Sequence, residues 1–248
     1  MKGIENVGRL AGKTILVTGA SSGFGRGIAL ACAAEGAAVA LVARREEKLR
    51  EVAALVEQQG VRAAVCAADV GDEAQIMAAV ESAVAQLGPL DVVVNNAGMN
   101  VAARSIVDTS SAEWRELLEV NLTSAYIFTR AVLPAMLERG HGTIINVASR
   151  AAAIPSLMAG VAYSTSKLGM DALTQVTNEE GNPHGVRATL ICPGEGDTPL
   201  LDRRPAPPPL EKRVNMLQPE DMGETVVLVA SLPPRVTIER IDIKPTQQ

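Results

Sequence analysis

The stretch TILVTGASSGFG, residues 14–25, decides the fold of this chain. Thr14–Thr18 is an apolar, β-branched run typical of a buried strand, and it passes directly into a turn with glycines at 19, 23 and 25. A helical pattern starts at Arg26. Glycines at a strand-to-helix turn let the backbone approach a pyrophosphate, and the helix N-terminus supplies free N–H groups. This context favours nucleotide binding over a simple tight turn.

Similar strand-like runs alternate with segments of helix length along the rest of the chain. The runs cover residues 38–42, 63–66, 91–94, 143–147, 187–191 and 238–243. Glycines at 36, 60 and 88 provide helix stops before the next strands. Strands that are apolar throughout need helices on both faces of their sheet. The pattern predicts one α/β domain over residues 1–248, a doubly wound parallel sheet of about seven strands.

Composition narrows the classes of partner. Of the 248 residues, 47 % are hydrophobic but only 2 % are aromatic, so Ala, Val, Leu and Ile must build the core. The net charge of −5 provides no basic field for a phosphate backbone, which argues against nucleic acid. Cys32, Cys66 and Cys192 lie far apart, and His141 and His184 lie in Gly- or Pro-flanked loops typical of the surface. We expect no disulfide framework and no metal site.

The sequence predicts neither a secretory signal nor a membrane span. Residues 1–12 have no apolar segment behind their single early lysine. The longest nearly apolar stretch, residues 27–43, is interrupted by Glu35 and Gly36, and it divides better into a helix end and a strand. We therefore expect a cytoplasmic protein with no membrane partner.

An arginine pair follows the second expected strand. Arg44 and Arg45 come directly after Leu41-Val42-Ala43, with no acidic residue before Glu46. An acidic side chain there would hold the ribose 2′-hydroxyl of NAD, whereas arginine suits the 2′-phosphate of NADP by its charge and planar fork. We expect NADP(H), with NAD(H) as the less favoured cofactor. The alternative is that both arginines merely begin a solvated helix.

Tyr163 and Lys167 occupy positions i and i+4 of an expected helix, so their side chains share one face. A phenol is a poor base at neutral pH, and a neighbouring ammonium would lower its pKa toward neutrality by stabilising the phenolate. Tyr163 is thus a candidate general acid or base. This spacing alone is common on surface helices, so the surrounding motifs must decide.

Those motifs resemble the short-chain dehydrogenase/reductase family, from about Leu10 to the C-terminus. Five elements occur in the family's order and at similar separations. They are the turn at residues 18–25, Asn95–Gly98 after a strand, Ser149 after residues 145–148, Tyr163–Lys167, and Pro193-Gly194 after a strand. The resemblance implies a Rossmann-like fold and hydride transfer between a nicotinamide and a small alcohol or carbonyl compound.

The resemblance also implies a role for each matched residue. Tyr163 would be the catalytic acid or base, Ser149 would bind the substrate oxygen, and Lys167 would grip the nicotinamide ribose and tune Tyr163. Asn121 would hold a water in a proton relay. The implied cofactor-binding residues are Gly19, Ser21, Ser22, Gly23, Phe24, Gly25, Arg44, Arg45, Asp69, Val70, Asn95, Asn96, Ala97, Gly98, Tyr163, Lys167, Pro193, Gly194 and Thr198. A homodimer or homotetramer would form through helices near residues 114–137 and 163–177.

The residues leave the substrate open. We expect a lid over about residues 195–217, with a loop at 202–209 because of its prolines. The lid mixes apolar side chains with Arg203, Arg204, Lys212 and Arg213, and a hydroxy acid would use one of these cations whereas a neutral alcohol would not. Gly196 stands where the family often has a hydrophobic residue, so we expect the segment to be looser or differently packed.

Two other functions remain open. A cofactor-binding redox sensor or scaffold without turnover would usually have lost the tyrosine, lysine or serine, and all three are present. An epimerase or dehydratase on the same fold would usually carry a larger C-terminal substrate domain. An NADP(H)-dependent oxidoreductase is therefore the leading hypothesis.

Overall fold

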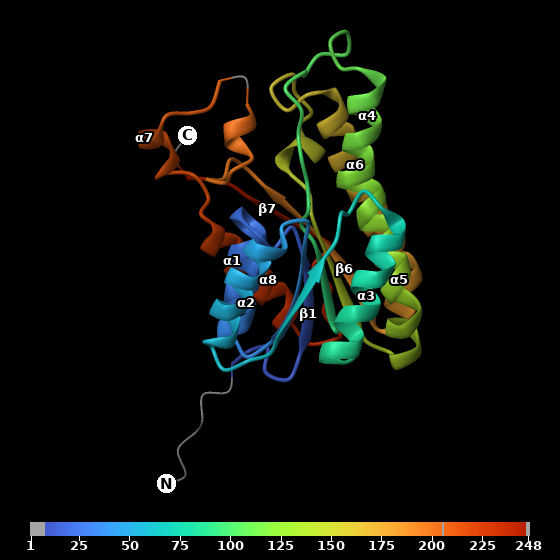
Figure 1. Ribbon diagram of the computed structural model, residues 1–248. Helices are drawn as coiled ribbons and strands as arrows, with labels where there is room; N and C mark the ends of the chain where they lie inside the picture. Colours follow the sequence, from blue (N-terminus) through green and yellow to red (C-terminus); the bar gives the residue numbers. More distant parts are fainter. Residues whose placement is uncertain (1–7, 205, 247–248) are drawn as a thin grey trace.

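The computed structural model describes residues 8–204 and 206–246, which form a seven-stranded parallel sheet with helices on both faces (Figure 1). The predicted doubly wound sheet is confirmed. In space the strands run β3-β2-β1-β4-β5-β6-β7. Their bounds are β1 Thr14–Thr18, β2 Ala38–Ala43, β3 Ala63–Ala67, β4 Val92–Asn95, β5 Gly142–Val147, β6 Val186–Pro193 and β7 Arg240–Ile243.

The helices form two layers around this sheet. Helices α1, α2 and α8 cover one face, and α3, α5 and α6 cover the other (Figure 1). Side chains alternate across each strand, so Ile15 and Val17 enter the first core whereas Leu16 enters the second. The α-helices are α1 Gly23–Ala34, α2 Glu46–Glu57, α3 Glu73–Leu87, α4 Ser111–Leu118, α5 Ser124–Arg139, α6 Val161–Gly181, α7 Leu210–Arg213 and α8 Pro219–Ser231.

Several shorter helical segments join these elements. A π-helical turn, Glu119–Thr123, links α4 to α5, and 3₁₀ turns cover Arg150–Ala152, Asn182–His184 and Leu201–Arg203. Helix α4 begins with a capping box, in which Ser110 accepts from the Glu113 backbone and the Glu113 carboxylate accepts in return from Ser110. Ser110 is therefore the N-cap of α4.

The strand order places a crevice at one edge of the sheet. β1 lies between β2 and β4. The chain adds β2 and β3 on one side of β1, and it then crosses to the other side of β1 to add β4 and the strands that follow. The loops leaving the carboxyl ends of β1 and β4 diverge at this reversal, which is where open α/β sheets bind ligands. The fold thus gathers all the motif residues at one edge.

The segment that contains Gly196 packs closely against the glycine-rich turn. A Cβ added at Gly196 would lie 2.1 Å from Phe24 Cζ, so the aromatic ring fills the space that a larger side chain would take. Gly196 also pairs with Leu217 in a parallel bridge. The segment is differently packed rather than loose. Of the predicted loop at 202–209, residues 202 and 203 belong to a 3₁₀ turn, and Pro205 lies outside the described residues.

Other sequence expectations concern cysteines, metals and membranes. Cys32, Cys66 and Cys192 are buried and free. In residues 8–204 and 206–246, no group of three or more His, Cys, Asp and Glu side chains is arranged to hold a metal ion. No helix in this described part is long and apolar enough to cross a membrane.

Candidate active site

A cleft of about 1170 Å³ opens at the carboxyl edge of the sheet. Every residue predicted to bind cofactor or act in catalysis lines it, except Asn95 and Asn121. Asn95 is buried behind the wall, where its Nδ2 donates to Asn146 Oδ1 (2.8 Å). Its side chain therefore joins two strands instead of reaching the cleft.

The glycine-rich turn offers open backbone donors at the start of α1. Gly19 and Gly23 adopt φ values of +67° and +53°, which side-chain-bearing residues rarely adopt. The N-cap residue of α1, Ser22, is extended, and its side chain makes no capping hydrogen bond. The first N–H groups of α1 are consequently not satisfied by a side-chain cap, and they suit an anionic phosphate.

Thr18 and Asn96 fix this turn against the neighbouring strand. The Thr18 hydroxyl accepts from the backbone N–H groups of Asn96 and Ala97, both at 2.9 Å. Asn96 Nδ2 donates to the Thr18 carbonyl oxygen at 2.9 Å. A Cβ added at Gly25 would lie 2.3 Å from the Gly19 carbonyl oxygen, so the turn can close only around glycine. The local sequence thus holds the turn rigidly.

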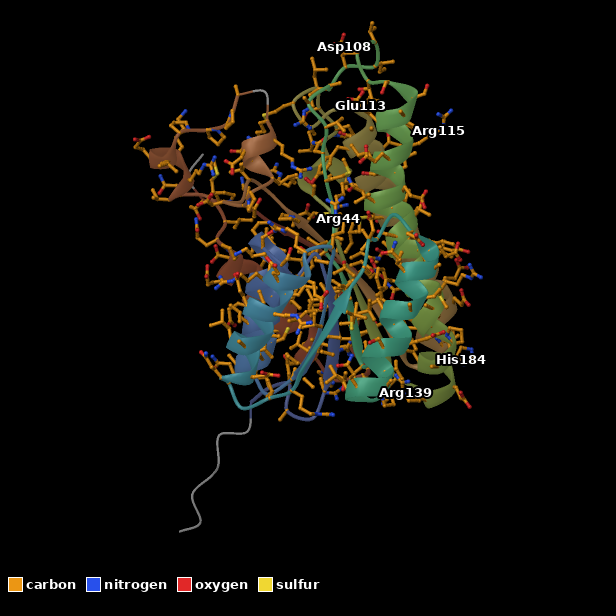
Figure 2. All side chains as sticks on the ribbon, in the orientation of Figure 1. Arg44, Asp108, Glu113, Arg115, Arg139 and His184 are labelled. Carbon is orange, nitrogen blue, oxygen red and sulfur yellow. The ribbon has the colours of Figure 1, made fainter. Side chains whose placement is uncertain are left out.

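The arginine pair stands beside the turn at the end of β2. Arg45 Nη2 donates to the hydroxyls of Ser21 and Ser22 at 3.2 and 3.3 Å. The Arg44 side chain is 69 % exposed and lies 3.9 Å from an Asp69 carboxylate oxygen. Figure 2 shows Arg44 near the centre of the molecule, at the carboxyl edge of the sheet. A guanidinium is therefore available to an additional phosphate at this point.

Ser149, Tyr163 and Lys167 come together on the opposite wall. The serine follows β5, while the tyrosine and lysine lie on the first two turns of α6. Lys167 Nζ lies 5.7 Å from the centroid of the Tyr163 ring, and it donates to the Val147 carbonyl oxygen at 3.0 Å. The predicted shared face is confirmed by this contact. A phenol, a hydroxyl and an amine thus face one part of the cleft.

The pKa of Tyr163 depends mainly on the burial of its phenol. Burial of the phenol raises its pKa, and this effect exceeds the lowering caused by the Ser149 hydrogen bond and the positive charges of Arg104 and Arg204. Burial also lowers the pKa of Lys167 to about 8, because no carboxylate in the described residues pairs with this amine. The protein alone does not bring Tyr163 toward neutrality; a bound positive charge would have to contribute.

Asn121 lies one layer behind the cleft, in the π-helical turn between α4 and α5. Its Oδ1 accepts from Met99 N (2.7 Å), and its Nδ2 donates to Met99 O and to Ser166 Oγ. A Cβ added at Gly98 would lie 3.5 Å from both Asn121 Oδ1 and Lys167 Nζ. The absence of a side chain at Gly98 leaves these two polar atoms facing one small space, which fits a bridging water.

The sequence did not predict Arg104 as a site residue, and it did not distinguish Arg204 from the other cations of the expected lid. Arg104, on the loop after β4, and Arg204, on segment 195–217, both line the cleft, and the charge of each lowers the pKa of Tyr163. Arg104 carries one usable signal, because it closely follows the carboxyl end of a central strand. No sequence signal indicates that Arg104 lies near Arg204, which is one hundred positions further along the chain.

The histidines lie apart from this chemistry. Figure 2 places His184 at the opposite edge of the molecule, near Arg139 and far from Arg44. His141 is exposed at the start of β5, 4.0 Å from an Asp91 carboxylate oxygen. Neither histidine lines the cleft.

Curated relatives match most of the chain in sequence. An uncharacterized oxidoreductase of Staphylococcus aureus (strain USA300) is 33 % identical over 95 % of this chain and 98 % of its own length. The glycine betaine reductase ATRR of Emericella nidulans is 34 % identical over 97 % of this chain. The chain spans only 19 % of that larger protein.

Solved structures match at a similar level, and a family model covers most of the chain. A metagenomic short-chain oxidoreductase in complex with NADP superposes with a TM-score of 0.83 at 34 % identity, covering 97 % of this chain and all of its own. A 3-ketoacyl-(acyl-carrier-protein) reductase from Brucella melitensis, complexed with NADH, gives 0.86 at 30 % identity, covering 96 % and 99 %. The family model described as short chain dehydrogenase matches residues 13–208. The chain therefore belongs to the short-chain dehydrogenase family and is an oxidoreductase of that family.

Proposed function

We propose that this protein is an NADP(H)-dependent oxidoreductase that interconverts a small alcohol and its carbonyl compound, with Tyr163 as general acid or base. The observation that carries the proposal is the convergence of Tyr163, Ser149 and Lys167 in the same cleft as an uncapped, glycine-rich helix N-terminus. One half of the cleft suits a phosphate, and the other half suits a reacting oxygen.

The residues fit a dinucleotide. The open N–H groups at the start of α1 would hold the pyrophosphate, and Asp69 and Val70 border the cleft where the adenine would lie. Arg44 and Arg45 would bind the ribose 2′-phosphate, which supports NADP(H) over NAD(H). When bound, the cofactor supplies or accepts the hydride at the substrate carbon.

The chain's own residues handle the oxygen and the proton. In the reducing direction, Ser149 and Tyr163 donate hydrogen bonds to the carbonyl oxygen and polarise it, and Tyr163 then gives up its proton. The raised pKa keeps Tyr163 protonated and ready to donate. Lys167 and Asn121, on either side of Gly98, would return a proton to Tyr163 through water.

An oligomer is also part of the proposal. Tyr126 on α5, and Leu168 and Val176 on α6, are large apolar side chains exposed to solvent. These are the two helices through which the family resemblance implies association. Analytical ultracentrifugation should show a dimer or tetramer at micromolar concentration, and a monomer would contradict this part of the proposal.

The sensor alternative differs from the enzyme in one measurable way. Tyr163→Phe removes the transferable proton but keeps the aromatic ring, so turnover should fall by about 10³-fold while NADPH affinity changes little. The measurements are NADPH oxidation with a panel of ketones, keto acids and aldehydes, and nicotinamide fluorescence for binding. Undiminished turnover would remove Tyr163 from its role, and NADPH binding without any turnover in the unaltered protein would favour the sensor.

A further inference from the structure

Arg104 is held rigidly beside the helix that carries Tyr163. Its backbone carbonyl accepts from Val161 N, the first residue of α6, at 3.0 Å. Its Nη1 donates to the Ala159 carbonyl oxygen at 3.1 Å. These two contacts tie the loop after β4 to the N-terminus of α6, two residues before Tyr163. The guanidinium therefore keeps a fixed position relative to the phenol.

Arg104 has no carboxylate partner among the described residues. Within residues 8–204 and 206–246, no carboxylate lies at ion-pair distance from it, and Ala159 O is its only hydrogen-bond acceptor. The side chain is half-buried and lines the cleft. Burial lowers its pKa, and repulsion from Arg204 lowers it further. A partly desolvated cation beside a second cation is costly unless an anion joins them.

Arg204, Arg213 and Lys167 already have hydrogen-bond or ion-pair partners. Arg204 Nη1 donates to Glu195 Oε1 at 2.7 Å, which neutralises part of its charge. Arg213 pairs with Asp197 and Asp202 and does not line the cleft. Lys167 donates to a backbone carbonyl. Of the two arginines whose charges act on Tyr163, Arg204 is paired with Glu195, whereas Arg104 has no carboxylate partner in the described residues.

We propose that the substrate of this oxidoreductase is an anion, a carbonyl compound with a carboxylate that binds Arg104 while its carbonyl oxygen lies between Ser149 and Tyr163. This inference rests on the proposed function and names its substrate class. The carboxylate fills the unused donors of a planar guanidinium, and Arg204 adds attraction across the cleft. In reduction, the carbonyl carbon gains the hydride from NADPH and the oxygen gains the Tyr163 proton, giving a hydroxy acid and NADP⁺.

A structural clasp is the competing role for Arg104, because it joins the loop after β4 to α6. The two roles differ in what they do to uncharged substrates. A clasp positions Tyr163 for every substrate equally, whereas a carboxylate-binding residue matters only when the carboxylate is present. Acid and methyl ester forms of one carbonyl compound therefore separate the roles.

The experiment measures NADPH oxidation with pyruvate, acetoacetate and levulinate, each against its methyl ester. The three acids vary the separation between carbonyl and carboxylate. Unaltered protein should prefer at least one acid to its ester by about tenfold or more in kcat/KM. Arg104→Gln should lower kcat/KM for that acid by about 10- to 100-fold, mainly through KM, and change the ester by less than about threefold. Arg104→Lys should restore part of the loss.

Arg115→Gln is the matched control. Arg115 lies on α4 outside the cleft, and Figure 2 shows its side chain pointing away from the body of the molecule. This variant removes the same charge, so it should leave the acid-to-ester ratio unchanged. An equal loss on acid and ester in Arg104→Gln, or no acid preference in the unaltered protein, would overturn the inference in favour of the clasp.

A binding measurement separates this inference from the proposed function. Isothermal titration calorimetry of acetoacetate into the NADP⁺-loaded protein, two oxidised partners that cannot react with each other, should give heat that Arg104→Gln reduces, with the methyl ester as the uncharged control. If the protein shows no turnover but still binds the acid in a way that depends on Arg104, the proposed oxidoreductase function would be wrong and the anion site would stand. Turnover of esters with no Arg104-dependent binding of acids would sink the anion site alone.

Discussion

Arg104 and Arg187 present the same residue type in two different surroundings. Both lack a carboxylate partner in the described part of the chain, and burial lowers the pKa of both. Arg187, on β6, donates to the carbonyl oxygens of Val229, Leu232, Pro233 and Val236, beyond and within the last turn of α8. Arg104 donates to one carbonyl and faces the cleft.

The comparison shows that burial of a charge does not by itself mark a functional site. Arg187 is only 5 % exposed, yet its terminal nitrogens are fully used and the C-terminal end of a helix favours a cation. Arg104 is less buried but retains unused donors. Counting hydrogen bonds therefore separates the structural arginine from the candidate binding residue.

The N-termini of the helices also differ in whether their polar groups have partners within the protein. Asp72 caps α3 by accepting from Gln75 N, and Ser110 caps α4 through its capping box. Ser22, at the start of α1, makes no side-chain cap. The two capped helix ends lie outside the cleft, and the uncapped one lines it. The N–H groups at the start of α1 are therefore left open at the place where a phosphate could accept from them.

Arg187→Met should produce the largest stability change in this comparison. Four carbonyl oxygens would lose their donor at once, so the free energy of unfolding should fall by about 3 kcal/mol in urea titrations. The kcat/KM of the folded fraction should not change, because Arg187 does not line the cleft. A stability loss below about 1 kcal/mol would show that the hydrogen bonds from Arg187 to these carbonyl oxygens contribute little to stability.

Arg44→Ala should produce a smaller change in free energy, and this change should affect the binding of NADPH rather than the stability of the fold. Loss of the guanidinium near a 2′-phosphate should weaken NADPH binding by about 10- to 100-fold and NADH binding by less than about threefold, measured by nicotinamide fluorescence. Arg50→Ala is the control, since this exposed arginine on α2 pairs with Glu46 outside the cleft. Equal weakening of both cofactors would overturn the assignment of Arg44 to the phosphate.

Lys167→Met should produce a smaller change in stability than Arg187→Met, and one of the opposite sign. The folded-state pKa of Lys167 lies near 8, below its ordinary value, so the charged amine destabilises the fold fully below pH 8. The variant should abolish turnover yet raise the free energy of unfolding by about 1 kcal/mol near pH 7, after the loss of the bond to Val147 O. Its advantage should shrink as the pH rises from about 8 toward about 10.5, because over this range Lys167 is neutral in the folded protein but still charged in the unfolded chain.

Urea titrations at neutral and alkaline pH check this sign. A variant that is less stable than the unaltered protein at neutral pH would mean that the hydrogen bond to Val147 O outweighs the burial of the charge. In that case Lys167, like Arg187, would stabilise the fold through hydrogen bonding to backbone carbonyl oxygen despite the burial of its charge.

The sequence by itself determined the sheet, the nucleotide turn and the helix that carries Tyr163 and Lys167. These features depend on local backbone preferences: β-branched runs form the strands, glycine permits the positive φ at Gly19 and Gly23, and i, i+4 spacing puts two side chains on one helix face. Such preferences act over a few residues, and they can be read directly from their order in the chain.

Only the tertiary structure decided how the polar groups of the cleft act on one another. It turned Asn95 away from the cleft, packed Phe24 against Gly196, and brought Arg104 and Arg204 to Tyr163 from separate segments. It also buried the Tyr163 phenol, which raises its pKa. Burial and charge act through space and depend on which distant segments meet, so their balance cannot be obtained from spacing along the chain.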